Sequence, residues 1–99
     1  MNLKPTMVIG LLTFELNIPA HSLKDKRQVV QSVKARLRHE FNVSVAEVDR
    51  QDSIQVAVLA AVCVASDGKY AHGLLSRVAG WVERTRLDCE LVDYSIEMV

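Results

Sequence analysis

The chain has 99 residues, of which 49% are hydrophobic and 24% charged, and its 12 basic side chains balance 12 acidic ones. A chain of this length and hydrophobic content builds one core, so we expect a single domain over residues 1–99 and exclude intrinsic disorder. The formal net charge of zero argues against a generic polycation that binds any nucleic acid.

The first two predicted elements are a strand over residues 6–18 and a helix over residues 23–40. Apolar residues alternate along the strand, and Pro19 ends it because proline cannot donate to a sheet ladder. Ser22 is the predicted N-cap of the helix, with Asp25 near the positive end of the helix dipole. The expected inward face of this helix is Leu23, Val30, Val33, Leu37 and Phe41.

A hairpin follows, made of a short strand, Asn42–Val48, a polar turn and a longer strand, Ile54–Ala65. The longer strand is apolar on both faces, so its pattern does not decide which face the helices cover. Three carboxylates near the turn, Glu47, Asp49 and Asp52, have the oxygen chemistry that magnesium prefers, but turns favour aspartate in any case. We expect no metal here.

The last two predicted elements are a helix and a strand. Asp67 is the expected N-cap of a helix that ends near Arg84, and Gly73 and Gly80 on it suggest that another backbone passes close by. The expected inward residues of this helix are Tyr70, Leu74, Val78, Trp81 and Val82. The final strand, Leu87–Met98, is expected to point Val92, Tyr94, Ile96 and Met98 inward, with Asp93, Ser95 and Glu97 outward.

The order β-α-β-β-α-β predicts an α+β fold, the ferredoxin-like sandwich, in which two helices cover one face of a four-stranded antiparallel sheet. The other face has no helix to cover it, yet the first strand places Met7, Ile9 and Leu11 there. An exposed apolar patch usually marks a partner surface, and scattered surface hydrophobic residues are the alternative. We therefore expect a homo-oligomer that associates through the open sheet face.

The first helix concentrates positive charge. Residues 24–38 contain six basic side chains and one acidic one, a net charge of +5, and the remaining six basic and eleven acidic residues carry −5. At 100° per residue, four cations fall on one flank about 21 Å long, enough to follow several phosphates. These cations are Lys24, Arg27, Lys34 and Arg38. A merely solvated basic face and contact with an acidic protein remain the alternatives.

Two further residues near the start of this helix, Lys26 and His21, could bind an anion. Lys26 lies at the edge of the apolar face, where a lysine whose stem covers apolar surface is the commoner explanation. No glycine-rich loop accompanies Lys26, which excludes a P-loop. The strand Ile54–Ala65 has no aromatic residue, which excludes the base-stacking mode of an RRM.

No pattern in the chain indicates catalysis, a metal or a cofactor. The two cysteines, Cys63 and Cys89, form no ligand pair with the scattered histidines, and their number excludes a cysteine-ligated iron–sulfur cluster. The apolar run Met7–Leu12 is too short for a membrane span or a signal peptide. We therefore expect a cytoplasmic protein that contacts no membrane.

Three segments carry a family resemblance that extends over essentially the whole chain. They are His21–Arg27 (HSLKDKR), Phe41–Asp49 (FNVSVAEVD) and Val92–Glu97 (VDYSIE). They resemble the YlxP-like family of small bacterial proteins, a domain of unknown function. The resemblance implies a ferredoxin-like fold, a cytoplasmic location and genes that sit among those for transcription antitermination, translation initiation and ribosome maturation. The family supplies no catalytic residues to transfer.

These observations favour a non-enzymatic accessory protein that associates with RNA or a ribosomal subunit through the first helix. An oligomeric regulatory module that binds a small ligand at the sheet interface is the alternative. A phosphatase-like enzyme that depends on Lys26 at the helix start is a third hypothesis.

Overall fold

Six elements follow one another in the predicted order in the computed structural model, which describes residues 6–85 and 88–99. They are β1 (Val8–Asn17), α1 (Leu23–Glu40), β2 (Ser44–Asp49), β3 (Val56–Ala65), α2 (Gly68–Arg84) and β4 (Glu90–Met98). The predicted bounds of α1 are the observed ones, whereas each of the first three strands begins two residues later than expected. Leu87, the expected start of the last strand, lies outside the described residues.

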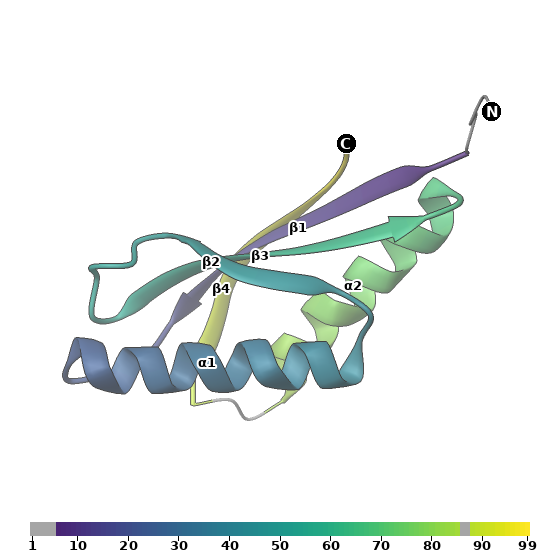
Figure 1. Cartoon of the computed structure of the whole chain (residues 1–99). Helices are drawn as coiled ribbons and strands as arrows, with labels where there is room; N and C mark the ends of the chain where they lie inside the picture. Colours follow the sequence, from purple (N-terminus) through teal and green to yellow (C-terminus); the bar gives the residue numbers. More distant parts are fainter. Residues whose placement is uncertain (1–5, 86–87) are drawn as a thin grey trace.

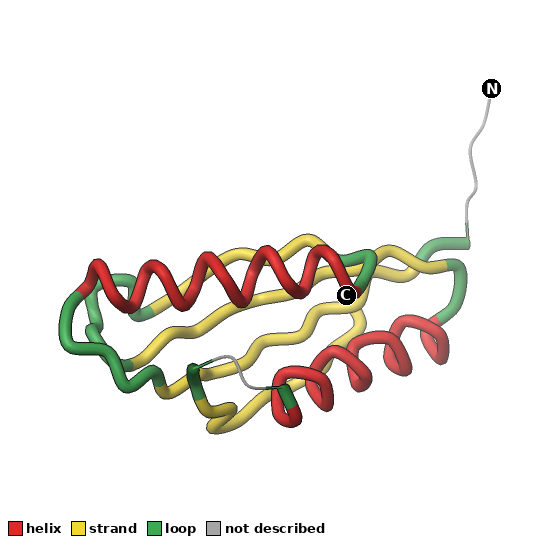
Figure 2. Tube along the Cα trace, turned by 90° about the horizontal axis from the view of Figure 1, so that it is seen from below, coloured by secondary structure: helices red, strands yellow, loops and turns green. Residues whose placement is uncertain are grey.

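The four strands form one antiparallel sheet in the order β2-β3-β1-β4. Both helices cover the same face of this sheet, as Figures 1 and 2 show from two sides. This arrangement confirms the α+β ferredoxin-like sandwich. The sheet therefore has one face packed on helices and one open face.

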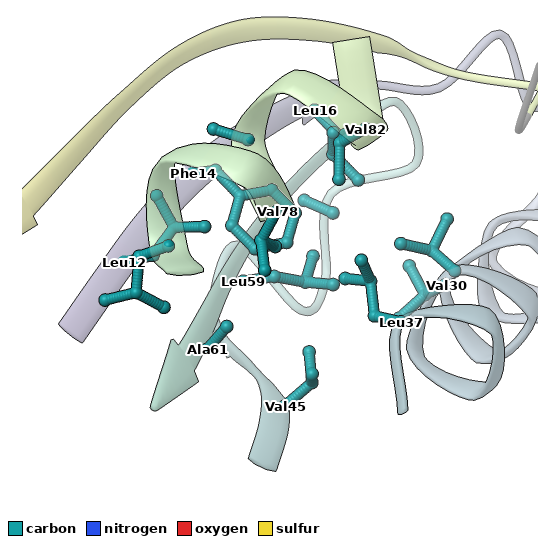
Figure 3. Packing of buried hydrophobic residues seen from close by; sticks show 14 of the residues in the cluster. Leu12, Phe14, Leu16, Val30, Leu37, Val45, Leu59, Ala61, Val78 and Val82 are labelled. Atoms are coloured by element: carbon teal, nitrogen blue, oxygen red, sulfur yellow. The ribbon is translucent and has the colours of Figure 1, made fainter. Parts of the chain in front are cut away.

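The core lies between the sheet and the helices, and alternation along β1 builds much of it. Leu12, Phe14 and Leu16 point from β1 toward the helices and are almost fully buried. They pack with residues of α1, α2 and β3, among them Leu37, Val78 and Leu59 (Figure 3). Ala57, Leu59, Ala61 and Cys63 line the buried side of β3. The valines of β3 therefore lie on the open face of the sheet.

The last strand departs from the predicted alternation. The register between β1 and β4 shifts at Glu15 and Leu16, where a β-bulge lets Leu91 pair with Leu16. Leu91 packs against the core, while Val92, expected to point inward, is 55% exposed. The prediction for Val92 is wrong because a bulge shifts the two-residue alternation by one position.

Both predicted helix caps are confirmed. The Ser22 hydroxyl accepts a hydrogen bond from the backbone N–H of Asp25 at 3.1 Å, and the Asp67 carboxylate accepts one from that of Tyr70 at 2.8 Å. The inward face of α2 differs from the expected one, since Tyr70 is 58% exposed and Trp81 is half-buried. Its buried residues are Ala71, Leu74, Leu75, Val78, Ala79 and Val82.

Close backbone approach occurs at a glycine other than those expected. A Cβ added to Gly10 in β1 would lie 2.9 Å from Leu75 Cδ1 and 3.3 Å from Ala71 Cβ, so α2 rests on the sheet at this point. A Cβ at Gly73 or Gly80 would meet only an arginine side chain of α2 itself within 4 Å, among the described residues. The inference that another backbone passes these two glycines is therefore wrong for residues 6–85 and 88–99.

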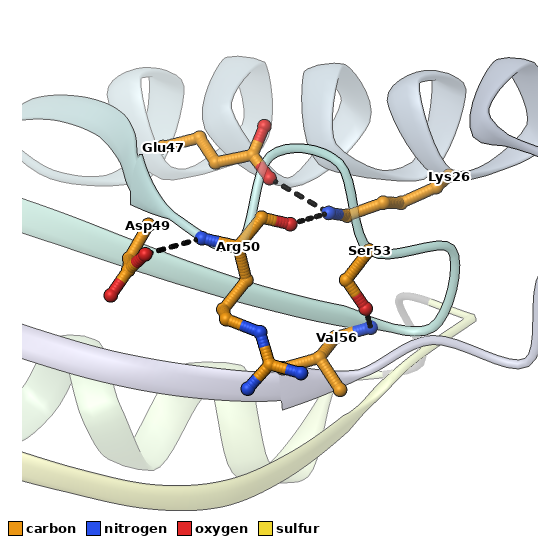
Figure 4. Close-up of polar contacts among 6 residues, drawn as sticks. All are labelled: Lys26, Glu47, Asp49, Arg50, Ser53 and Val56. Carbon is orange, nitrogen blue, oxygen red and sulfur yellow. Dashed lines mark hydrogen bonds and ion pairs between the residues drawn. The ribbon is translucent and has the colours of Figure 1, made fainter.

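One buried polar link joins α1 to the β2–β3 hairpin. Lys26 points inward from α1 and is only 1% exposed. Its ammonium lies 3.0 Å from Glu47 Oε2 of β2 and donates a hydrogen bond to the Arg50 carbonyl oxygen at 2.6 Å (Figure 4). The same carbonyl accepts from the Ser53 N–H at 3.0 Å, and Arg50 itself has a positive φ of 60°. Lys26 thus holds the turn and sets the rotation of α1.

Removal of the Lys26 ammonium tests this link. In Lys26→Met the Glu47 carboxylate, whose side chain is 17% exposed, loses its partner. We expect the free energy of unfolding, measured by urea denaturation, to fall by about 3 kcal/mol. The double variant Lys26→Met/Glu47→Leu should regain most of this loss, because it removes the second buried charge as well.

Lys24→Met provides the control, because Lys24 is exposed on the same helix and its loss should change stability by less than about 0.5 kcal/mol. A Lys26→Met variant that unfolds at the wild-type urea concentration would contradict the role of the ion pair. A double variant whose free energy of unfolding falls by the sum of the losses in Lys26→Met and Glu47→Leu would also contradict it.

The glycines give a second stability prediction. Gly10→Ala overpacks the contact with Leu75 and should cost about 1–3 kcal/mol. Gly73→Ala places a methyl group at ordinary van der Waals distance, 3.8 Å, from the Arg77 guanidinium, so the helix should gain up to about 1 kcal/mol. Thermal unfolding of both variants measures the difference, and the reverse order of melting temperatures would show that α2 does not rest on Gly10.

Candidate functional site

The predicted cations lie along the flank of α1 that faces away from α2. We call this surface the basic flank and define it by Lys24, Arg27, Gln31, Lys34 and Arg38. Its direction follows from two contacts. The Arg38 guanidinium donates a hydrogen bond to the Val45 carbonyl oxygen at 2.9 Å, on the edge strand β2. On the opposite side of α1, the Arg36 guanidinium lies 5.3 Å from the centre of the Trp81 ring of α2.

Three cations of the basic flank have no partner within the described part of the chain. Lys24 and Arg27 are exposed and Lys34 is half-buried, and their side chains make no hydrogen bond or ion pair with any residue in 6–85 or 88–99. Lys24 and Arg27 also line an open depression with Gln28 and Gln31. These cations therefore project an uncompensated positive field into solvent.

The remaining two candidate residues are placed elsewhere. The Lys26 ammonium is buried against Glu47 and the Arg50 carbonyl, so it does not face a ligand in solvent. His21 is exposed and lines a separate surface hollow with Asp52 and Ser53. Neither residue belongs to the basic flank.

An aromatic contact holds the other side of α1. The rings of Phe41 and Trp81 meet edge to face, with centroids 6.2 Å apart and planes at 86°. Phe41 is the C-cap of α1 and Trp81 lies on α2, so this contact joins the two helices. With Arg36 stacked on the same Trp81 ring, the flank of α1 that faces α2 is occupied, whereas Lys24 and Arg27 of the basic flank are exposed.

The open face of the sheet carries the predicted apolar residues. Met7 is 58% exposed, and Ile9 and Leu11 are half-buried on the same side of β1. β3 extends this surface with an unbroken row of uncharged side chains. The row consists of Val56, Val58, Ala60, Val62 and Val64, and Val64 is 66% exposed.

Carboxylates border this apolar row on the β4 side. Glu15 of β1 pairs directly with Asp93 of β4, and Glu97 lies opposite Leu11. Thr13, Glu15, Val58, Asp93 and Ser95 line a hollow of about 190 Å³ together with Phe14 and Tyr94. Small-molecule sites usually measure about 300–1,000 Å³, so this hollow gives no support to the ligand-binding alternative.

The acidic turn is engaged in internal contacts. Glu47 is paired with Lys26, and Asp49 Oδ1 accepts a hydrogen bond from the Arg50 N–H at 2.8 Å. Among residues 6–85 and 88–99, no three histidine, cysteine, aspartate or glutamate side chains come together in a group that could hold a metal ion. No helix in the described part of the chain is long and apolar enough to span a membrane.

Both cysteines are free thiols, and Cys63 is buried. Burial, with a smaller contribution from the negative charge of Asp88, raises the pKa of the Cys89 thiol to about 11. At neutral pH this thiol is therefore almost entirely protonated, and it is a poor nucleophile.

Glu47 is the ion-pair partner of Lys26, and the sequence did not lead us to predict this pair. A signal for it exists, because Val45 and Glu47 alternate along β2 and so point to the same face as the core. An inward carboxylate on β2 next to an inward lysine on α1 would have indicated the buried pair.

Comparisons with known proteins identify the family of the chain. A family model described as "Protein of unknown function (DUF503)" matches residues 9–96. The Uncharacterized protein YlxP of Bacillus subtilis (strain 168) is 33% identical over 64 residues, which cover 65% of this chain and 70% of that protein.

Among solved structures, the de novo designed protein Foldit4 superposes with a TM-score of 0.53 at 13% identity, over 94% of this chain and 96% of the other. This likeness concerns the fold alone. The match to the family model covers most of the chain, and the resemblance to YlxP-like proteins is confirmed. The chain therefore belongs to the DUF503 family of proteins of unknown function.

Proposed function

We propose that this chain is a non-enzymatic accessory protein of the bacterial cytoplasm that contacts RNA, free or in a ribosomal subunit, through the basic flank of α1. The observation that carries the proposal is the set of three cations, Lys24, Arg27 and Lys34, that no described side chain neutralises. Cations in such a row attract a phosphate backbone without reading its sequence.

The length and rigidity of the basic flank support this proposal. From Lys24 to Arg38 the helix rises about 21 Å, at 1.5 Å per residue. The rotation of α1 is held from inside by Lys26 and from the side by Trp81, so the cations keep their spacing without help from a ligand. Arg38 adds positive charge at one end while its guanidinium remains bonded to β2.

The second part of the proposal concerns self-association. An apolar sheet face with Met7 and Val64 more than half exposed is unfavourable in water and fits a protein surface better than RNA. We assign this face to contact between copies of the chain. The basic flank and the open face belong to different layers, so both contacts can form at once (Figure 1).

The other hypotheses have less support. A phosphatase-like role would need Lys26 at a solvent-facing anion site, whereas its ammonium is buried and paired. A small-ligand module would place its pocket at the interface of an oligomer, and on the open sheet face the hollow between Glu15 and Asp93 measures only about 190 Å³.

Removal of the three unpaired charges tests the RNA contact. In Lys24→Gln/Arg27→Gln/Lys34→Gln we expect weaker binding to a labelled single-stranded RNA, measured by fluorescence anisotropy. Three phosphate contacts predict a slope of log affinity against log salt of about −2, so wild-type affinity should fall about fifteenfold between about 50 and 200 mM salt. The variant should lose most of this dependence.

Lys69→Gln/Arg77→Gln/Arg84→Gln is the matched control, because it removes three exposed charges from α2. It should bind RNA nearly as tightly as the wild type and remain folded. Equal weakening by both triple variants would show that net charge, and not the basic flank, drives binding. Absence of RNA binding at low salt would overturn the proposal. Co-sedimentation of the same proteins with small ribosomal subunits, at a series of salt concentrations, makes the same comparison for the ribosome.

A further inference from the structure

The middle of the open sheet face is an uncharged strip. β3 lies between β2 and β1, so its outward residues run along the interior of the sheet and not along an edge. All five of them are apolar: Val56, Val58, Ala60, Val62 and Val64. Ile9 and Leu11 of β1 pair with Val64 and Val62 and widen the strip at one end.

The carboxylates on this face border the strip on both sides. Glu15, Asp93 and Glu97 occupy β1 and β4, Asp49 of β2 pairs with Val58, and no lysine or arginine belongs to any of the four described strands. Phosphates would be repelled from these carboxylates, which disfavours RNA as the occupant of this face. A partner that covers the strip itself meets only uncharged side chains of β3.

The strip therefore fits a surface that is apolar and uncharged along its middle, and a second copy of this chain presents one with the same twist. We propose that two copies stack their open sheet faces with β3 over β3, and that the β4 carboxylates remain at the rim. This inference rests on the proposed self-association and specifies its geometry. Stacked sheets of this kind align their strands within about 30° and lie about 10 Å apart.

The size of the face is near the lower end of what a stable dimer needs. The four strands have 10, 6, 10 and 9 residues. At about 3.3 Å per residue and about 4.8 Å between strands, they cover about 550 Å², compared with about 600 Å² per partner in the smaller stable interfaces. Open-face residues of β1, β2 and β3 contribute apolar contacts to this face.

The rim carboxylates give this dimer a distinctive response to salt. Both copies bring negative charges to the interface and neither brings a lysine or arginine from its strands, so the electrostatic contribution opposes association. Raising salt from about 0.1 M to 1 M shortens the Debye length from about 10 Å to 3 Å. The dimer should therefore tighten severalfold over this range, whereas RNA binding by the basic flank weakens.

Two cysteine variants with small side chains test where the copies meet. Ala60→Cys places a thiol at the centre of β3, and Ser95→Cys places one on β4 of the same face. Sheets about 10 Å apart are too distant for a disulfide, so a short bismaleimide cross-linker is the probe. The wild-type chain provides a low background, because Cys63 is buried and the raised pKa of Cys89 keeps its thiol protonated.

Sedimentation velocity across salt accompanies the cross-linking. We expect a dimer that tightens as the salt concentration is raised. Ala60→Cys should be cross-linked, whereas cross-linking of Ser95→Cys should stay at the wild-type background. Preferential cross-linking of Ser95→Cys, or a dimer that weakens with salt, would overturn the β3-centred arrangement while self-association stands. A monomer at all salt concentrations would overturn self-association itself, and the RNA measurements would be unaffected.

Discussion

The buried ammonium of Lys26 is the contact on which the arrangement of the molecule depends. It joins the first turn of α1 to Glu47 on the edge strand and to the carbonyl at the β2–β3 turn, so it fixes α1 in rotation as well as position. A helix held only by Val30, Val33 and Leu37 could roll on an apolar surface, because hydrophobic contacts are non-directional. An ion pair buried to this extent permits only one rotation and leaves the other cations outside.

Once α1 is fixed, the charges of a formally neutral chain are separated in space. The basic flank faces outward beside β2, and the carboxylates Glu15, Asp93 and Glu97 lie on the open face toward β4. Net neutrality is thus the sum of a basic helix and an acidic remainder, not an absence of charged surfaces. The proposed RNA contact and the proposed contact between copies therefore use different layers of the molecule.

Local patterns were sufficient to predict the order of the elements, both N-caps and the buried face of β1, because each depends on neighbours within a few residues. Features set by long-range register were not predictable in this way. Lys26 and Glu47 are 21 positions apart, and the bulge that exchanges Leu91 for Val92 depends on how β4 pairs with β1. The open side of β3 could not be chosen in advance, since its two faces are similarly apolar. The basic flank was found from helical spacing, but the structure was needed to show that Lys24, Arg27 and Lys34 have no partner among the described residues.

The central claim is that the basic flank of α1, and not the sheet, meets RNA. The most direct measurement is a titration of the isotope-labelled protein with single-stranded RNA at low salt, followed by amide chemical shifts in NMR spectra. The account predicts that the largest shifts map to residues 24–38 of α1 and disappear as salt is raised, with little change along β3. Shifts concentrated on the open face of the sheet, or spread evenly over both helices, would contradict it.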